Sequence, residues 1–143
     1  MRAGLINSTD KSVRIINYKP NSKGKADALT YMHTLLNCRV ISCVPTDDYD
    51  NQKLSLFVDD ESLVTPGPKT FFYIPDLYPL PLCGNGLILG FNFETGESIT
   101  IPKALSNDLL QGSCHVGFPN IEEVLKIERN LRQERGHEMY GEL

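Results

Sequence analysis

The fold class is decided by one stretch of sequence, Gly84-Asn85-Gly86-Leu87-Ile88-Leu89-Gly90-Phe91-Asn92-Phe93-Glu94-Thr95-Gly96-Glu97-Ser98-Ile99-Thr100-Ile101-Pro102. From residue 87 to residue 93 the pattern repeats every two residues, as in a strand with one buried face. Glu94-Thr95-Gly96 fits a short turn whose glycine adopts a positive φ. The alternation resumes at Ile99 and ends at Pro102, which has no N–H to donate. We therefore predict a β-hairpin in the core, with Leu89, Phe91 and Ile99 buried.

The flanking sequence supplies the other elements of an α+β domain. We expect strands at residues 13–18, 39–44, 53–58 and 114–118, of which 39–44 is apolar on both sides and is therefore predicted to be an inner strand. The first strand should stop at Pro20, before a polar turn. Helical periodicity predicts helices at residues 26–37, at 103–110 with Gly112 as a left-handed cap, and from Asn120, which forms a capping box with Glu123. This order predicts a mostly antiparallel sheet with an early helix and a C-terminal helix packed on it.

Length and composition predict a single domain over residues 1–143. The chain has 143 residues, 41% of them hydrophobic and 22% charged, which is ordinary for a globular protein. The C-terminal helix should occupy residues 119–135, and residues 136–143 should fray. No apolar run has the length of a membrane span, and residues 1–10 lack the core of a signal peptide. We therefore expect no membrane partner and a cytoplasmic location, in the host cytoplasm if a phage encodes the chain.

The net charge of −4 is unevenly distributed. Residues 1–39 carry a net charge of +5, residues 40–125 a net charge of −9, and residues 126–143 balance. The basic excess therefore falls in a segment that must also supply a strand and a helix. A solvated surface explains this pattern better than a phosphate-binding face does, so the sequence disfavours a nucleic-acid partner.

The segment from residue 65 to residue 81 combines rigidity with aromatic side chains. Its five prolines exclude a regular helix or central strand. It also holds Phe72, Tyr73 and Tyr78, and tyrosine and phenylalanine are enriched in interface cores. The segment is either a lid over the core or a contact surface. As a contact surface it offers these three residues as candidate binding residues, with Arg129 and Arg132 on the last helix as a second candidate group.

The four cysteines, Cys38, Cys43, Cys83 and Cys114, have no C-x-x-C spacing. Core packing explains them better than a zinc site or disulfides, so we expect no metal and no cofactor. Cys83 is the better candidate nucleophile, because the neighbouring glycines favour an exposed turn. A thiol nucleophile also needs a histidine within hydrogen-bonding distance, however, and the sequence does not indicate one.

The hairpin also carries a family resemblance. Residues 86–92, Glu94-Thr95-Gly96 and Ile101-Pro102 resemble a domain of unknown function that is common in bacteria, phages and plasmids. Residues 111–117 look like the final glycine-containing strand of that family, and the likeness extends over residues 13–118. The resemblance implies a small accessory protein of a mobile element, and it carries over no catalytic residue.

Three hypotheses for the function follow. The leading hypothesis is a non-enzymatic accessory protein of phage or mobile-element type that binds a host macromolecule, most plausibly a protein, and inhibits a host or defence function. The alternative is a pocket protein that sequesters a small nucleotide-like ligand, for which Arg14, Lys19, Lys23 or Lys25 should converge with Tyr73 or Tyr78. The third is a cysteine-dependent enzyme that uses Cys83 or Cys114. The last helix also makes a homo-oligomer conceivable, through Ile127 off its main apolar stripe.

Overall fold

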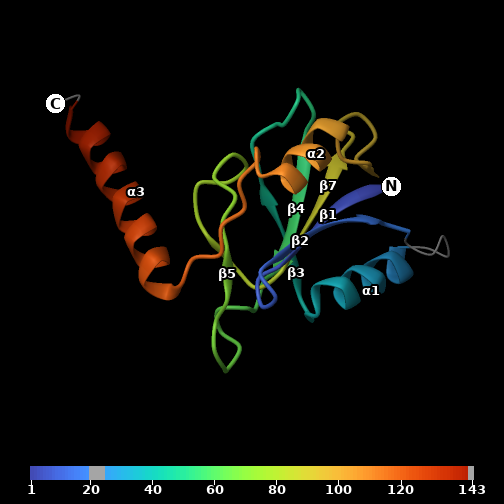
Figure 1. Cartoon of the computed structure of the whole chain (residues 1–143), viewed down its shortest axis with the longest axis horizontal. Helices are drawn as coiled ribbons and strands as arrows, with labels where there is room; N and C mark the ends of the chain where they lie inside the picture. The colour runs from blue at the N-terminus through green and yellow to red at the C-terminus, as the bar shows by residue number, and fades with distance from the viewer. Residues whose placement is uncertain (20–24, 142–143) are drawn as a thin grey trace.

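A computed structural model describes residues 1–19 and 25–141 and confirms the α+β class (Figure 1). The main sheet has the order β2-β1-β7-β4-β3, and β8 also pairs with β7. All of these pairings are antiparallel. The elements are β1 (Arg2–Asn7), β2 (Ser12–Asn17), α1 (Lys25–Leu36), β3 (Ile41–Pro45), β4 (Leu54–Asp59), β5 (Phe71–Phe72), β6 (Leu82–Cys83), β7 (Gly86–Phe91), β8 (Ser98–Ile99), α2 (Lys103–Gln111) and α3 (Ile121–Gly141).

The predicted hairpin lies in the middle of the sheet. Gly90 pairs with Ile99 and Phe91 pairs with Ser98, which confirms the predicted hairpin. β7 is buried on both faces, however, because β1 and β4 flank it and apolar layers cover both sides. Leu89 is fully buried, whereas Phe91 and Ile99 are only half-buried, so their predicted burial is wrong. Both residues lie where the paired part of the hairpin ends.

Each face of the sheet has its own apolar layer. On one face, Met32 and Leu36 of α1 pack against Leu5, Leu87 and Leu89. The other face is covered by α2, through Leu105 and Leu109, and by three residues of the proline-rich segment, Phe72, Ile74 and Leu77. The proline-rich segment is therefore part of the core on the α2 face.

The structure adds one strand that the sequence did not predict and corrects three other predictions. β1 was not predicted, yet it lies between β2 and β7. β3 is an edge strand and not an inner one, which suits the proline at its end. Residues 114–118 form no strand beyond one isolated bridge between Tyr73 and Gly117. The last helix runs to Gly141, past the boundary expected at 135. The turn predicted at residues 20–24 lies outside the described residues.

Two predicted helix caps are confirmed. α2 closes at Gly112, whose φ of 86° is the left-handed conformation that glycine tolerates best. Asn120 and Glu123 form the predicted capping box. The Asn120 N–H donates to the Glu123 carboxylate (3.2 Å), and the Glu123 N–H donates to the Asn120 side-chain oxygen (2.9 Å).

Candidate functional site

The proline-rich segment is anchored by side chains that point into the core. Phe72 has an exposed fraction of 1% and packs with Ile74 and Leu77 against the sheet. Phe72 is therefore unavailable to a partner, and its prediction as a surface contact is wrong. The pairing of β5 with β6 explains the burial, because Phe71 and Phe72 form a short strand at the base of the segment.

Tyr73 and Tyr78 lie at the surface, half-buried, on a backbone that is held at several points. The Tyr73 N–H donates to the Gly117 carbonyl and the Gly117 N–H donates to the Tyr73 carbonyl, both at 2.8 Å. The Tyr78 N–H donates to the Ile74 carbonyl at 3.0 Å. Pro75 and Pro79 are exposed and restrict the backbone further. The two tyrosines are thus carried by a segment that loses little conformational entropy on binding.

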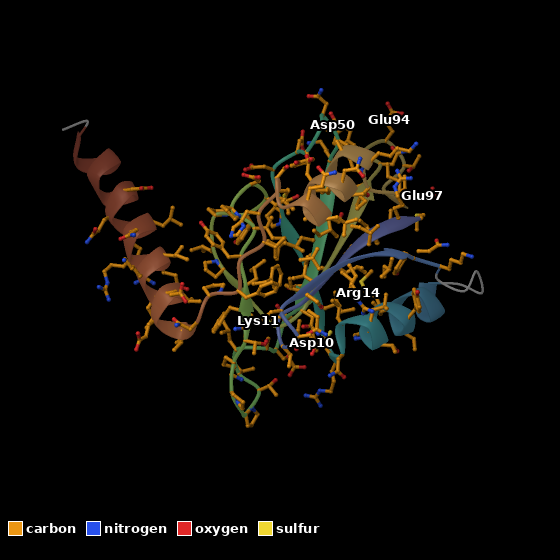
Figure 2. All side chains as sticks on the ribbon, in the orientation of Figure 1. Asp10, Lys11, Arg14, Asp50, Glu94 and Glu97 are labelled. Atoms are coloured by element: carbon orange, nitrogen blue, oxygen red, sulfur yellow. The ribbon has the colours of Figure 1, made fainter. Side chains whose placement is uncertain are left out.

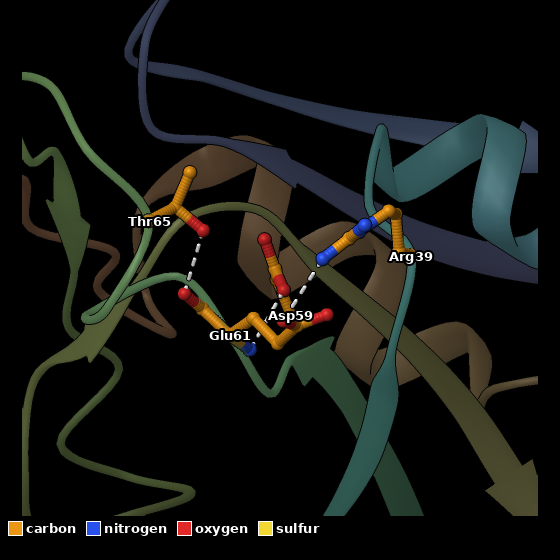
Figure 3. Close-up of polar contacts among 4 residues, drawn as sticks. All are labelled: Arg39, Asp59, Glu61 and Thr65. Atoms are coloured by element: carbon orange, nitrogen blue, oxygen red, sulfur yellow. Dashed lines mark hydrogen bonds and ion pairs between the residues drawn. The ribbon is translucent and has the colours of Figure 1, made fainter.

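The start of the segment is also fixed by polar contacts (Figure 3). Thr65 donates its hydroxyl to the Glu61 carbonyl (2.8 Å), and the Glu61 N–H donates to the Asp59 carboxylate (2.9 Å). Arg39 forms an ion pair with the Glu61 carboxylate at 3.2 Å. Because the Arg39 side chain is largely exposed, the ion pair adds little stability. The backbone contacts therefore do most to define the turn that leads into the proline-rich segment.

Helix α3 stands away from the main sheet and is docked near its start (Figure 1). Val124 is buried against Phe71 and Cys83, at the pair of short strands β5 and β6. One turn later, Glu128, Leu131 and Arg132 face Leu80 across a hollow of about 160 Å³. Arg129 is exposed. The structure thus brings Arg132 close to Leu80, at the end of the proline-rich segment.

Two apolar residues of α3 remain uncovered. Ile121 has an exposed fraction of 54% and Leu125 one of 50%. Both residues share a stripe at helical spacing with Val124 and Leu131, but only Val124 is fully covered. The amphipathic pattern of α3 indicates an apolar stripe. It does not indicate that the rest of the protein contacts only one edge of that stripe.

Three hollows of the described residues bear on the predicted nucleotide site. A polar hollow of about 190 Å³ lies around Asn85 and includes Asp59, Ser62 and Lys69. A second hollow, of about 490 Å³, opens beside Met1 and Arg2. Neither of these, nor the hollow at Leu80, is lined by Arg14, Lys19, Tyr73 or Tyr78. Lys23 lies outside the described residues, as does the side chain of Lys25.

Three acidic side chains lie at one end of the molecule. Figure 2 shows Asp50, Glu94 and Glu97 at the end beyond α2, whereas Asp10, Lys11 and Arg14, which are of mixed charge, lie on the side nearer α1. On the acidic side, the Tyr49 hydroxyl donates to the Asp108 carboxylate, and this hydrogen bond raises the pKa of Tyr49. The contact ties the loop before β4 to α2. Its role is therefore structural.

Core packing, which the sequence predicted for all four cysteines, holds for two of them, since Cys43 is exposed and Cys38 is only half-buried. Cys83 and Cys114 are buried, and the Ser62 hydroxyl donates to the Cys83 sulfur at 2.8 Å. Burial, with Asp76 and Asp108 nearby, raises the pKa of the Cys114 thiol to about 11, which opposes the thiolate that a nucleophile requires. In residues 1–19 and 25–141, no three histidine, cysteine or acidic side chains are placed to hold a metal ion.

Comparisons with protein-family models, with curated proteins and with solved structures found no match to this chain. The resemblance of the hairpin region to the domain family therefore stays a prediction. Within the part of the chain that the structure describes, none of the helices combines the length and the hydropathy needed to cross a bilayer.

Proposed function

We propose that this chain is a non-enzymatic binding protein whose partner is another protein. Its contact surface consists of Tyr73, Pro75, Tyr78 and Pro79, with the guanidinium groups of Arg129 and Arg132 at the rim. The observation that carries the proposal is the backbone anchoring of Tyr73 and Tyr78, which holds half-exposed aromatic side chains in fixed positions. Tyrosine offers a large contact area with few rotatable bonds, so it suits a preformed interface.

The composition of this surface favours a particular kind of partner. Tyrosine and arginine are the residue types that most often dominate binding energy at protein interfaces. The tyrosine rings need an apolar patch on the partner, and the two arginines need carboxylates at its edge. A protein surface with apolar residues bordered by acidic side chains meets both needs.

The biological setting of the proposal rests on the resemblance of the hairpin region alone. A small accessory protein of a phage or mobile element would meet its target in the host cytoplasm. There it would inhibit a host or defence function by occupying a surface that the target needs. The binding chemistry proposed above does not depend on this setting.

The experiment compares three tagged forms of the chain in pull-downs from host lysate, quantified by mass spectrometry. These are the wild type, the Tyr73→Ala, Tyr78→Ala double variant, and Phe93→Ala. Phe93 is the matched control, because its ring is 74% exposed on the hairpin turn, outside the contact surface. Circular dichroism first establishes that all three forms are folded.

A protein retained by the wild type and by Phe93→Ala, and lost from the double variant, is the expected result. Equal retention by all three forms would refute the contact surface. The same proteins are screened against nucleotides by thermal shift. A strong shift of the wild type with a nucleotide, together with no retained protein, would replace the proposal with sequestration of a small ligand.

A further inference from the structure

The polar hollow around Asn85 is built by several segments that are distant in the chain. Its wall takes residues from the turn between β1 and β2, the end of α1, the end of β4, residues 62–70 and the residues just before β7. These segments bring together side chains of both charges with amide and hydroxyl groups. The wall therefore offers several kinds of polar group to one small volume.

The two charged side chains of this wall, Asp59 and Lys69, are both brought to the hollow by contacts at Gly84. A Cβ on Gly84 would lie 2.9 Å from the Ser62 Oγ and 3.7 Å from the Asp59 Cβ, so Asp59 lies beside this glycine. The Gly84 N–H donates to the Thr70 carbonyl at 2.9 Å, which brings Lys69, the preceding residue, to the same region. Both charged side chains are half-buried.

These opposite charges do not pair with each other. In residues 1–19 and 25–141, the Lys69 side chain forms no hydrogen bond and no ion pair, and Asp59 forms no ion pair. The Asp59 carboxylate accepts only the Glu61 N–H, at 2.9 Å. A half-buried charge without a counter-charge gains free energy when a ligand supplies one. A ligand that carries both charges can pair with Asp59 and Lys69 at once.

Asn85 adds a hydrogen-bond donor in a fixed position. Its side-chain oxygen accepts the Ser8 N–H at 3.0 Å, which orients the amide group. The amide nitrogen of Asn85 donates to no other described residue. A ligand carboxylate has two oxygens, so it can accept one hydrogen bond from Asn85 and another from the Lys69 ammonium group.

The size of the hollow limits the ligand to a small molecule. A cavity of about 150 Å³ accommodates benzene, which has about six non-hydrogen atoms. The hollow has a volume of about 190 Å³, which suits a molecule only slightly larger and excludes a whole nucleotide. Thr9 and Thr65 also line it, and their hydroxyl groups suit a ligand with a polar side chain.

We propose that this hollow binds a small zwitterion, an α-amino acid with a short side chain. Its carboxylate lies at Lys69 and Asn85, and its ammonium group lies at Asp59. The inference does not rest on the proposed function, because neither Tyr73 nor Tyr78 lines the hollow. The two sites can therefore be tested separately.

NMR titration of the ¹⁵N-labelled full chain tests the proposal, with L-serine and glycine as the zwitterions. Two analogues of serine each lack one charge: 3-hydroxypropionate has no ammonium group, and ethanolamine has no carboxylate. The wild type should bind L-serine at least about tenfold more tightly than either analogue, since each analogue loses one charge-assisted contact. The amide signals of Gly84 and Asn85 should shift on binding.

Two variants assign the two charges. Lys69→Met should weaken binding of L-serine at least about tenfold and leave binding of ethanolamine within about twofold. Asp59→Asn should weaken binding of L-serine equally and leave that of 3-hydroxypropionate unchanged, and its amide oxygen can still accept the Glu61 N–H. Lys103→Met is the matched control, because Lys103 is an exposed lysine of α2 outside the hollow, and it should bind L-serine like the wild type.

The NMR spectrum of each variant first establishes that it is folded. The absence of shifts with both L-serine and glycine, up to about 50 mM, would overturn the proposal. Equal binding of L-serine by the wild type and by both charge variants would overturn it as well. Inorganic phosphate is titrated alongside, and tighter binding of phosphate than of L-serine would make the hollow an anion site instead.

Discussion

The ring of Phe72 lies across Gly86, so close that a Cβ on Gly86 would come within 2.6 Å of it. The base of the proline-rich segment is thus seated directly on the central strand β7. This contact joins the element that carries the candidate contact surface to the most buried part of the sheet. The position of the two tyrosines therefore depends on the core.

Gly86→Ala should lower the free energy of unfolding by about 1–3 kcal/mol, because a rigid ring has little room to move away from the added methyl group. In a Phe72→Leu background, Gly86→Ala should lower the free energy of unfolding by clearly less, because the aromatic ring is no longer present. Urea denaturation of the four proteins measures this coupling. Gly117→Ala is the control, because its Cβ would meet no atom closer than 3.5 Å. Equal costs in both backgrounds would show that the ring does not limit this site.

Leu89 and Phe91 should differ in their contribution to stability, although the sequence pattern predicted burial of both. Leu89 has an exposed fraction of 0%, so Leu89→Ala should cost about 2–5 kcal/mol through the cavity that it leaves. Phe91→Ala should cost less, since half-burial means that less apolar area is lost. Thermal and urea unfolding compare the two. If Phe91→Ala were less stable than Leu89→Ala, the prediction would be wrong, and the end of the hairpin would be packed more tightly than the structure shows.

Val124→Ala should release the start of α3 without unfolding the sheet. The substitution removes about 1–2 kcal/mol of apolar contact with Phe71 and Cys83. Trypsin should then cleave after Lys126 and Arg129 roughly tenfold faster, while the melting temperature of the sheet changes little. Leu125→Ala, at the exposed neighbouring position, should leave the cleavage rate of dilute protein unchanged. Similar rates for both variants would mean that Val124 does not hold the helix.

Stability should decline between about pH 9 and pH 11. The pKa of Cys114 is raised from 9.0 to about 11 in the folded protein, so the folded state keeps its thiol proton where the unfolded state loses it. The stability that the protonated Cys114 thiol contributes to the folded state is fully present below pH 9 and is lost as the pH rises from 9 to about 11. The Cys38 thiol, also raised to about 11, adds to the loss.

The measurement is urea unfolding at about pH 8 and about pH 10.5, for the wild type and Cys114→Ala. Cys114→Ala should be less stable than the wild type at pH 8, because the substitution leaves a cavity. Its free energy of unfolding should nevertheless fall less than that of the wild type between pH 8 and pH 10.5. An identical loss in both proteins would show that Cys114 does not contribute to the decline.

The sequence predicted those elements whose signals are local. The hairpin, the capping box of Asn120 and Glu123, and the glycine cap at Gly112 each depend on residues within a few positions of one another. β1 was missed because Ala3-Gly4-Leu5-Ile6 is short and contains a glycine. It becomes a strand through its pairing with β2 and β7, and β7 is distant in the chain. The edge position of β3 has the same origin, since apolar residues on both sides do not reveal which strands flank them.

The candidate site was predictable only in part. The prolines and aromatic residues marked a rigid segment, but which rings face inward depends on the pairing of Phe71 and Phe72 with Leu82 and Cys83. That pairing left Tyr73 and Tyr78 at the surface and removed Phe72. The exposure of Ile121 and Leu125 depends on how α3 docks, which periodicity alone does not determine.

The central claim is that another protein binds at Tyr73 and Tyr78, and photo-crosslinking tests it most directly. A photoreactive phenylalanine replaces Tyr78 in one form of the full chain and Phe93 in another, and both are irradiated in host lysate. We predict one dominant crosslinked protein from position 78 that is absent from position 93. No crosslink at position 78, or the same set of proteins from both positions, would contradict the claim.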